Sequence, residues 1–541
     1  MNNKNLFYII ISKLRMPIIA LIIIYSIGIL GIKIIPGTND IGEIYNLSFF
    51  DAFYIVSYTS TTIGFGESPF PWNDNQKMFM LLFIYSSVIC WIWAINSIIT
   101  ILRDKEISKV REEYKTLQKL KHMYKGFYII AGIDETGHEI AKILTRHGFC
   151  VVAIDKDESK IEELRMYDYC EDVISFNGDI NNIDVLKICG IENKLCEGVI
   201  VSTGDDNTNW YTSSASRILN KKIKIITVAI NRKTQESLDS IHINHIVSPY
   251  DHFANEMIQA INQPMFNMLR VQVTSETFEH YKEINPQKGK WIIFGYEKIG
   301  QVLLKKMSDA GNEVILVDIK KSAKDFCEKN NIQIIQESSF LDAKDKIDFS
   351  NVNGVVSSYK DDLKNLSVIM NVREINDKIF TVVYENQFKN KELFEKLDAD
   401  LVVQKQEMTT RKIHYLVSEP LLGEFLKHMS QASEKTCAYV VAKLKSKYEK
   451  QCLETWHIKI DKNNSTGIYE ILKKGKIKIK NITNNNKVIS LIIKRNNKFI
   501  LLPNSEELMA IGDEILFTGS HKEYRRMLWI IHHSNILEEL I

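Results

Sequence analysis

The 541-residue sequence lacks any close pairing of cysteines. Its eight cysteines are scattered, with no C-x-x-C pair and no Cys/His spacing typical of a metal site. We therefore expect reduced, mostly buried thiols in a cytosolic setting. The chain also lacks an excess of either charge, because 69 Lys and Arg against 67 Asp and Glu leave a formal net charge of +2. This balance gives no electrostatic basis for binding nucleic acid.

Long uncharged runs are absent from most of the chain and are confined to its first hundred residues. Residues 16–32 carry no charge, and the apolar run resumes at Ile34 after Lys33, whose side chain can snorkel to a membrane interface. Residues 78–102 form a second uncharged run, of 25 residues. Because about 20 apolar residues cross a bilayer, we expect two membrane spans, at about 16–35 and 78–102.

The charges around these two spans predict their orientation. Basic residues flank the outer ends of the pair, namely Lys4, Lys13, Arg15, Arg103, Lys105, Lys109 and Arg111. The loop between the spans is acidic, with Asp40, Glu43, Asp51, Glu67 and Asp74. By the positive-inside rule, both termini are expected in the cytoplasm. We expect a multi-pass protein of the cell (inner) membrane, with the lipid bilayer as a partner.

The loop between the spans holds a helix-like run and then a glycine-rich segment. Ser48 with Asp51 three residues later resembles a capping box and predicts a short helix at about 48–61. The next five residues are Thr62, Ile63, Gly64, Phe65 and Gly66. Irregular backbone at membrane depth is tolerated only where it is buried in protein or lines water. Alternate glycines permit alternate positive φ angles, so that carbonyl oxygens can replace the water around a dehydrated cation.

This segment resembles the selectivity filter of potassium channels, with Ile63 in place of Val and Phe65 in place of Tyr. The resemblance implies K⁺ as the transported ion, bound by oxygens of Thr62, Ile63, Gly64 and Phe65. Glu67 stands where Asp is usual. Phe65 lacks the hydroxyl with which Tyr could brace the filter.

The second predicted span departs from the family pattern. Family members often carry a glycine hinge there, whereas residues 78–102 contain neither Gly nor Pro. Bending would have to use the small residues Ser86, Ser87, Ala94 or Ser97, or else the gate lies elsewhere.

Beyond a charged linker at 103–126, the sequence repeats itself. The predicted strand 127–131 leads into the glycine turn 132–137, a helix, and a second strand ending at Asp155. The same order recurs at the turn 295–300 and Asp318, and both pairs of positions are 163 residues apart (295 − 132 and 318 − 155). Strand, glycine turn, helix and strand with a terminal acid predict a βαβ unit. The sequence therefore predicts two Rossmann-like domains in tandem.

Together these motifs resemble the RCK (regulator of potassium conductance) family, whose domains form a cytosolic ring below two-span potassium channels. The resemblance implies a multidomain fold: an α-helical pore domain, two Rossmann-like α/β domains and a small C-terminal α+β domain of the TrkA-C type. It also implies a homotetramer with an eight-domain gating ring that binds a small molecule or an ion. The expected boundaries are 1–102, 103–126, 127–270, 290–410, 411–452 for connecting helices, and 453–541.

The glycine turns are candidate nucleotide sites. A turn at a helix N-terminus offers N–H groups to phosphate, and an acid ending the second strand can bind the ribose of NAD(H) or an adenine nucleotide. The candidate residues are Gly132, Asp134, Glu135, Thr136, Gly137, Asp155, Lys156, Asp179, Thr203 and Asp205 in the first repeat, and Gly295, Glu297, Gly300 and Asp318 in the second.

Two other interpretations of the turns remain open. Asp134 and Glu297 replace the middle glycine of the fingerprint and would repel a pyrophosphate, in which case the glycines only tighten the turn. Alternatively, acids at the strand ends could together bind Ca²⁺. These acids are Asp134, Asp155, Asp179, Asp205 and Asp206.

We therefore expect a potassium-selective channel subunit, not an enzyme, gated by a ligand of its cytosolic domains. A membrane-anchored NAD-dependent oxidoreductase would explain the Rossmann repeats but not the pore loop, and no Tyr-x-x-x-Lys motif placed for hydride chemistry is evident. A non-conducting regulatory subunit is a third hypothesis, against which the intact filter argues.

Overall fold

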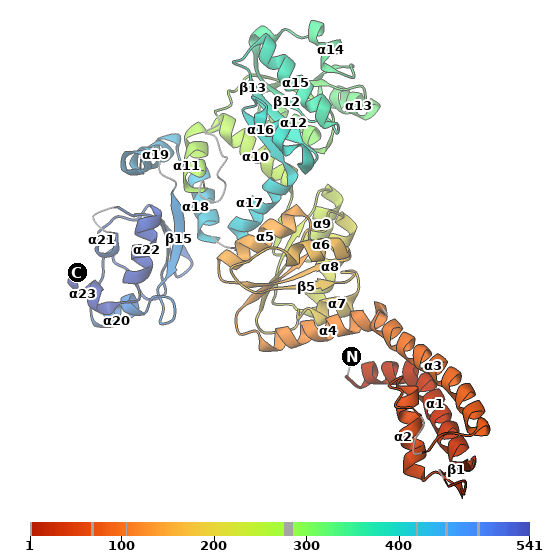
Figure 1. The fold of residues 1–541 in the computed structure, drawn as a ribbon. Coiled ribbons are helices and arrows are strands. Elements are labelled where there is room, and N and C mark those ends of the chain that lie inside the picture. The colour runs from red at the N-terminus through yellow and green to blue at the C-terminus, as the bar shows by residue number, and fades with distance from the viewer. Residues whose placement is uncertain are drawn as a thin grey trace. The chain divides into compact units, whose positions relative to one another are not determined.

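The structure is a computed structural model that describes residues 3–39, 41–66, 70–103, 105–274, 285–417, 420–448, 453–483 and 487–540. The chain divides into two compact units, residues 1–123 and 124–541. Figure 1 shows the helices and strands of each unit and labels many of them.

The first unit is helical. It contains α1 (Asn3–Ile34), α2 (Phe49–Ser60), α3 (Asp74–Leu102) and α4 (Lys105–His122), with a short β1–β2 pair (Gly37–Thr38 and Ile44–Tyr45) between α1 and α2. Two of its helices contain stretches long and apolar enough to cross a membrane, Ile11–Ile34 and Asp74–Ile101. Most large apolar side chains of these stretches are exposed on the single chain, as expected of surfaces that face lipid or other subunits.

Local sequence chemistry sets where α2 and α3 begin. The Ser48 hydroxyl accepts the Asp51 N–H at 3.1 Å and donates to the Asp51 carboxylate at 2.6 Å. Asn73 and Gln76 form a full capping box at the start of α3. The first three helices share a small core that includes Ile29, Ile55 and Met80.

Close approach of α1 to α3 depends on two glycines. A Cβ at Gly28 would lie 2.4 Å from the Phe83 ring, and one at Gly31 would lie 2.0 Å from the Phe79 ring. Small residues of this kind let membrane helices approach closely. The two phenylalanines of α3 therefore pack directly against the backbone of α1.

The second unit starts with a six-stranded parallel sheet in the order β5-β4-β3-β6-β7-β8. Its strands are β3 (Phe127–Ala131), β4 (Cys150–Asp155), β5 (Val173–Asn177), β6 (Cys196–Val201), β7 (Lys224–Val228) and β8 (His245–Val247). The helices that connect them are α5 (Glu135–Arg146), α6 (Glu158–Arg165), α7 (Ile183–Ile188), α8 (Asp206–Leu219) and α9 (Arg232–Ser240). Strands β4 and β5 extend the sheet on one side of β3, and β6, β7 and β8 extend it on the other. The carboxyl end of β3 therefore lies at the topological switch point.

A second parallel sheet repeats this topology in the order β11-β10-β9-β12-β13-β14. Its strands are β9 (Lys290–Phe294), β10 (Glu313–Val317), β11 (Gln333–Ile335), β12 (Val352–Ser357), β13 (Phe380–Glu385) and β14 (Leu401–Gln404). Its α-helices are α12 (Lys298–Asp309), α13 (Lys321–Asn330), α14 (Phe340–Ala343), α15 (Asp362–Ile375) and α16 (Lys391–Lys396). The matching order confirms that the sequence repeat encodes two Rossmann-like folds.

Helices that come after each sheet pack into the core of the other. After β8, α10 (Pro249–Asn262) contributes Phe253 and Met257 to the core around β9 and α12. After β14, α17 (Lys405–Val417) contributes Ile413 and Val417 to the core around β3 and α5. This exchange of helices joins the two sheets through apolar packing.

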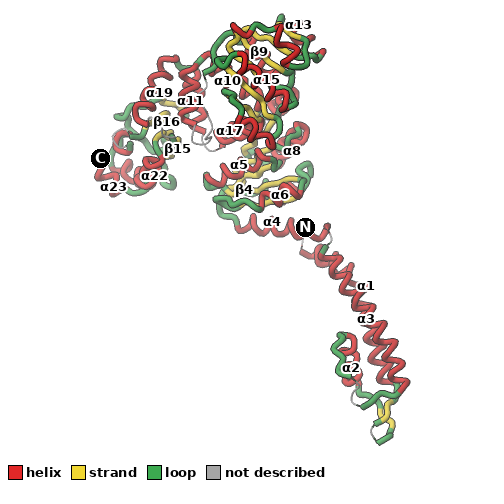
Figure 2. The backbone as a smooth tube through the Cα atoms, turned by 45° about the horizontal axis from the view of Figure 1, so that its top comes forward, coloured by secondary structure: helices red, strands yellow, loops and turns green. Residues whose placement is uncertain are grey.

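The C-terminal part is α+β. It is preceded by α11 (Pro264–Thr274), α18 (Pro420–Ser430) and α19 (Glu434–Tyr448), and its antiparallel sheet has the order β15-β18-β16-β17. The strands are β15 (Glu454–Lys459), β16 (Ile489–Arg495), β17 (Lys498–Leu501) and β18 (Glu514–Gly519), with helices α20 (Thr466–Lys474), α21 (Ile479–Ile482), α22 (His521–Ile530) and α23 (Ser534–Leu540). Figure 2 distinguishes the strands of the three larger sheets from the surrounding helices by colour. The fold class expected from the sequence is confirmed.

Candidate functional site

In the segment after α2, residues with positive φ angles alternate with residues with negative φ angles. The φ angle is +62° at Thr62, +65° at Gly64 and +93° at Gly66, whereas Ile63 and Phe65 keep negative φ. Regular alternation of this sign places successive N–H groups on one side of a chain and successive C=O groups on the other. The geometry is therefore suited to presenting a column of carbonyl oxygens.

Hydrogen bonds tie both ends of this segment to α2. The N–H of Thr62 donates to the Thr59 carbonyl at 3.1 Å, and the N–H of Ile63 donates to the Tyr58 carbonyl at 3.0 Å. At the other end, the Tyr58 hydroxyl donates to the Gly66 carbonyl at 2.7 Å. Glu67, noted in the sequence as a departure, lies outside the described residues.

Sequence reasoning missed this role of Tyr58. Phe65 has no hydroxyl to brace this segment, and the Tyr58 hydroxyl of α2 braces it instead. The Phe65 ring packs edge-on against Tyr58 and stacks on Tyr54, at centroid distances of 5.5 and 6.2 Å. The signal in the sequence is the run of aromatic residues on α2, which includes Tyr54 and Tyr58.

The first glycine turn joins β3 to α5 at the switch point of the sheet. Gly132 has a φ of +96°, and a Cβ there would lie 2.4 Å from the Ser202 carbonyl oxygen at the end of β6. A Cβ at Gly137 would lie 2.3 Å from the Gly132 carbonyl oxygen. Both glycines are therefore needed for the turn itself, whatever else it binds.

Asp134 caps α5 from within the turn. Its carboxylate accepts the Gly137 N–H at 3.1 Å, which places a negative charge where the fingerprint would seat a phosphate. Burial raises the pKa of Asp134, while Lys405 and Lys160 act in the opposite direction. The turn thus has a built-in acid with lysines in electrostatic range.

Asp155, predicted as a ribose ligand, also braces the turn. Its two oxygens accept the N–H of Ile133 at 2.8 Å and the N–H of Asp157 at 2.9 Å, and Lys160 lies 3.7 Å away. Its side chain is only 10% exposed. Each oxygen retains one lone pair for a further donor.

The second turn repeats this construction. Gly295 has a φ of +94°, and Asp318 accepts the N–H of Tyr296 at 2.8 Å and of Lys320 at 2.7 Å. Glu297 forms an ion pair with the Lys320 ammonium at 2.5 Å. Gly300 is closely packed, since a Cβ at this position would lie 2.3 Å from the Gly295 carbonyl oxygen.

The two turns differ in the residues that follow the neighbouring strand, which is β6 in the first sheet and β12 in the second. In the first, the Thr203 N–H and hydroxyl both donate to the Asn209 side chain, at 2.9 and 2.7 Å. In the second, Tyr359 takes the place of Thr203; its N–H donates to Asn365, and burial raises the pKa of its phenol. The second turn thus carries a tyrosine where the first has a threonine, together with a partly exposed Glu297–Lys320 ion pair.

The remaining predicted residues spread along the same edge of the first sheet. Asp205 caps α8 by accepting the Thr208 N–H at 2.9 Å, and Asp179 accepts the Asn181 N–H at 3.0 Å. Glu135 and Lys156 are exposed, whereas Thr136 is buried in the first turn of α5.

The structure gives the calcium hypothesis no donor set. Within the described residues, no group of three or more His, Cys, Asp or Glu side chains is placed to hold a metal ion. Asp206, for example, accepts the N–H groups of Ile230 and Asn231 at 3.0 and 2.7 Å. The strand-end acids thus serve turns and helix caps.

The matches to protein families fall on the same parts of the chain as the structural domains. Residues 17–104 match the family described as "Ion channel", and residues 128–249 and 291–405 both match the TrkA-N domain. The two TrkA-N matches cover the two parallel sheets.

Individual relatives are distant. A protein of Methanothermus fervidus described as uncharacterized is 27% identical over 267 residues, which are 48% of this chain and 40% of that protein. The "Probable potassium channel protein 2" of Methanocaldococcus jannaschii is 23% identical over 275 residues, 50% of this chain and 76% of that protein. Among solved structures, "GsuK Channel" matches at 14% identity with a TM-score of 0.48, over 97% of this chain and 99% of that one.

Proposed function

We propose that the chain is a subunit of a two-transmembrane potassium channel with tandem RCK (TrkA-N) domains, and that it conducts K⁺ selectively under the control of a cytosolic ligand. One observation carries the selectivity proposal: the alternating backbone at residues 62–66, held at both ends by α2. Carbonyl oxygens of Thr62, Ile63, Gly64 and Phe65 are the proposed K⁺ ligands, because they can replace the hydration shell of the ion.

Four copies of the chain are the proposed assembly. One copy supplies one strand of carbonyl oxygens, and a ring of oxygens around an ion needs several such strands on a common axis. The orientation is inferred from the basic residues outside the two spans, which favour cytoplasmic termini. Eight Rossmann-like domains would then lie on the cytosolic side of one pore.

Ion flux through the purified full-length protein tests selectivity. Reconstituted in planar bilayers between KCl and NaCl, the channel is expected to show a reversal potential close to that of a pure K⁺ conductance. Tyr58→Phe removes the bond to the Gly66 carbonyl and leaves the ring, so the ratio of K⁺ to Na⁺ permeability should fall. Tyr54→Phe is the control, because Tyr54 contacts Phe65 only through its ring. Equal K⁺ and Na⁺ currents in the unaltered protein would refute the proposal.

The first Rossmann-like domain is the proposed ligand sensor, and the proposed ligand is NAD(H) or an adenine nucleotide. Its glycine turn lies at the switch point of the sheet, where such folds bind ligands. Lys156, Lys160 and Lys405 provide positive charge near this edge, which suits a phosphate displaced from the turn by Asp134. Asp155 can still accept a ribose hydroxyl. The second domain is the weaker candidate, because its turn carries Tyr359 in place of Thr203 and the Glu297–Lys320 ion pair.

Thermal unfolding of the detergent-solubilised full chain tests the sensor. A ligand that binds the native state raises its midpoint in a concentration-dependent way. NAD⁺, NADH, ADP and ATP should be compared, and the shift should be lost in Lys156→Met but retained when Lys320 is replaced by Met. A shift abolished only by the second replacement would move the site to the other domain. No shift with any of the four would remove nucleotides as the ligand class.

A further inference from the structure

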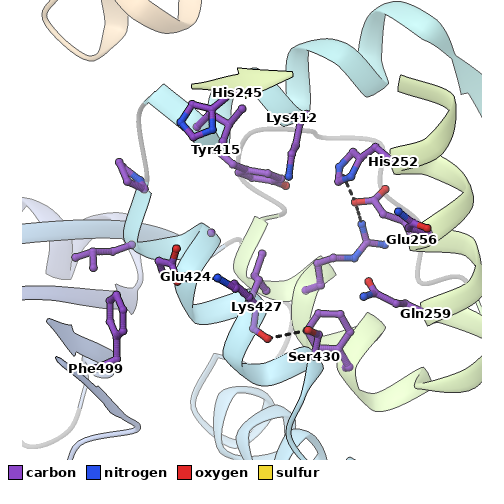
Figure 3. Close-up of a pocket in the computed structure, with 18 of the residues that line it drawn as sticks. His245, His252, Glu256, Gln259, Lys412, Tyr415, Glu424, Lys427, Ser430 and Phe499 are labelled. Atoms are coloured by element: carbon purple, nitrogen blue, oxygen red, sulfur yellow. Dashed lines mark hydrogen bonds and ion pairs between the residues drawn. The ribbon is translucent and has the colours of Figure 1, made fainter. Parts of the chain in front are cut away.

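A cavity of about 690 Å³ lies within the second unit, away from both glycine turns. Its walls come from the edge strand β8 and its neighbour β7, from helices α10, α11, α17 and α18, and from strands β16, β17 and β18. Its volume is in the range of sites that bind small molecules. Figure 3 shows ten of its lining side chains with labels.

The most deeply buried acid of the cavity wall is already neutralised. The Glu256 carboxylate forms ion pairs with Arg270 and, at 3.0 Å, with Arg411, and His252 lies 3.4 Å from it. Figure 3 shows Glu256 beside His252 on one wall. Because both guanidinium groups bind this carboxylate, neither is left as an anion-binding fork.

The other two acids of the wall have lysine partners as well. Glu514 lies 3.0 Å from the Lys494 ammonium, across two strands of the C-terminal sheet. Glu424 lies 3.8 Å from Lys427, one turn along α18. The latter pair is largely exposed, so Lys427 can turn toward another anion at little energetic cost.

Among the residues that the structure describes, two lysines of the wall form no ion pair with a carboxylate, although Glu256 is within electrostatic range of Lys412. Lys224 at the start of β7 donates to the Leu416 carbonyl, and within the described part of the chain neither Lys224 nor Lys412 pairs with a carboxylate. Burial lowers the pKa of both ammonium groups. The pKa of His245 is lowered by burial and then by these two lysines, so the three groups lie within electrostatic range. Two partly buried ammonium groups without a paired carboxylate are costly to hold near each other, and an anion that joins them would reduce this cost.

From this arrangement we infer that the cavity is a second ligand site, which binds a small phosphate-bearing anion through Lys224, Lys412 and His245. Lysine ammonium groups act as point charges that suit the oxygens of a phosphate, whereas bidentate carboxylate recognition uses arginine forks. Figure 3 shows Lys412 and Lys427 on opposite sides of the cavity. Lys427 is therefore available to a second anionic group of the same ligand.

A ligand here would contact three parts of the second unit at once. Lys224 and His245 belong to the first sheet, Lys412 to the helix that leaves the second sheet, and Phe499 to the C-terminal sheet. Binding would favour whichever arrangement of these parts brings the basic groups to the anion. The site is separate from residues 62–66 and from the sheet edge beside the first glycine turn, here called the nucleotide edge. Binding to it does not depend on conduction.

Titration calorimetry on the full chain in detergent tests the inference, with inorganic pyrophosphate as the probe and NaCl to match ionic strength. Lys412→Met and Lys224→Met, which keep side-chain length and remove the charge, should each weaken binding by at least about tenfold. Lys329→Met is the matched control, since this lysine is exposed on α13. Lys156→Met removes only pyrophosphate that binds at the glycine turn of the first domain, so the binding that depends on Lys224 and Lys412 should persist in this variant.

Each outcome decides the matter. Binding lost in Lys412→Met and Lys224→Met but kept in Lys156→Met supports the cavity. Binding lost only in Lys156→Met places the anion at the nucleotide edge, and no binding to the unaltered chain rejects a phosphate site; both overturn the inference. Melting curves without probe guard against misfolding, because removing an uncompensated buried charge should leave the midpoint unchanged or raise it. If both variants melt far below the unaltered chain, the lysines serve folding and the inference fails.

Discussion

At the scale of single residues, Glu385 is a buried acid that forms no ion pair within the described residues, with Lys391 acting on it only at a distance. It ends β13 with 2% of its surface exposed, and Gln404 donates to one carboxylate oxygen. Its other oxygen has no hydrogen-bond partner within the described residues. Burial raises the pKa of Glu385 to about 7, so a proton is bound more tightly in the native state than in the unfolded one.

This residue predicts a pH dependence of stability. Because the native pKa is raised, the contribution of Glu385 is fully present below its unfolded pKa of about 4.3. It is lost as pH rises toward 7. The total loss is about 1.4 kcal/mol for each unit by which the native pKa exceeds the unfolded pKa. Glu385→Gln should flatten this part of the profile and raise the thermal midpoint at pH 7.5. Melting curves of both proteins at half-unit intervals from pH 4.5 to 8 measure it; parallel profiles would refute the assignment.

Asp155 and Asp318 show where inference from sequence stops at this scale. Their position after the second strand was predicted from the repeat, together with both glycine turns. Their use was not, because an acid that binds ribose and one that binds the N–H groups of the turn stand at the same position. Only the distances to Ile133, and to Tyr296 in the second repeat, distinguish them.

At the scale of elements, the contact between α1 and α3 depends on the absence of two side chains. Phe79 and Phe83 occupy the space that a Cβ at Gly31 or Gly28 would fill. Hydrophobicity predicted both helices, but it did not predict this contact, because lipid-facing and protein-facing surfaces of a membrane helix are equally apolar.

The contact predicts a specific double-mutant result. Gly31→Ala should lower stability by about 1–3 kcal/mol, because its methyl group overlaps the Phe79 ring. Combining it with Phe79→Ala should recover part of the loss, since the overlap then disappears. Thermal midpoints in detergent measure the cycle. Gly423→Ala is the control, because a Cβ there meets no atom within 4 Å; additive effects of the two membrane replacements would contradict the packing.

Helix α3 runs from Asp74 to Leu102 without a break and contains neither Gly nor Pro. Ser86 and Ser97 donate their hydroxyls to carbonyls four residues earlier, at 2.9 and 2.8 Å. Such bonds compete with the helix ladder and often bend helices. They are the proposed points at which α3 could flex.

At the scale of the whole molecule, the exchange of α10 and α17 makes the two Rossmann-like folds interdependent. The sequence repeat predicted both folds because strand and turn motifs recur locally. It could not predict the exchange, because an apolar helix face indicates that the helix is covered without indicating which sheet covers it. The cavity escaped prediction for the same reason: Lys224 and Lys412 lie 188 positions apart (412 − 224) in the sequence.

The ion cluster around Glu256 holds this exchange together and predicts a large effect. Burial alone would raise the pKa of Glu256, but Arg270 and Arg411 hold it well below its ordinary value. The charged carboxylate therefore joins α10, α11 and α17, and its contribution is present above its unfolded pKa and lost as pH falls below that value.

Replacing Glu256 with Gln removes the buried carboxylate that both guanidinium groups bind, which should destabilise the native state by about 3–5 kcal/mol. Since the three helices bridge both sheets, the loss should appear in the unfolding of the whole second unit and not of one domain. Glu424→Gln is the matched control, because its exposed pair with Lys427 is worth at most about 1 kcal/mol. Unfolding followed by hydrogen exchange at β3 and β9 measures both effects. Protection lost at only one of the two strands would mean that the exchanged helices do not couple the folds.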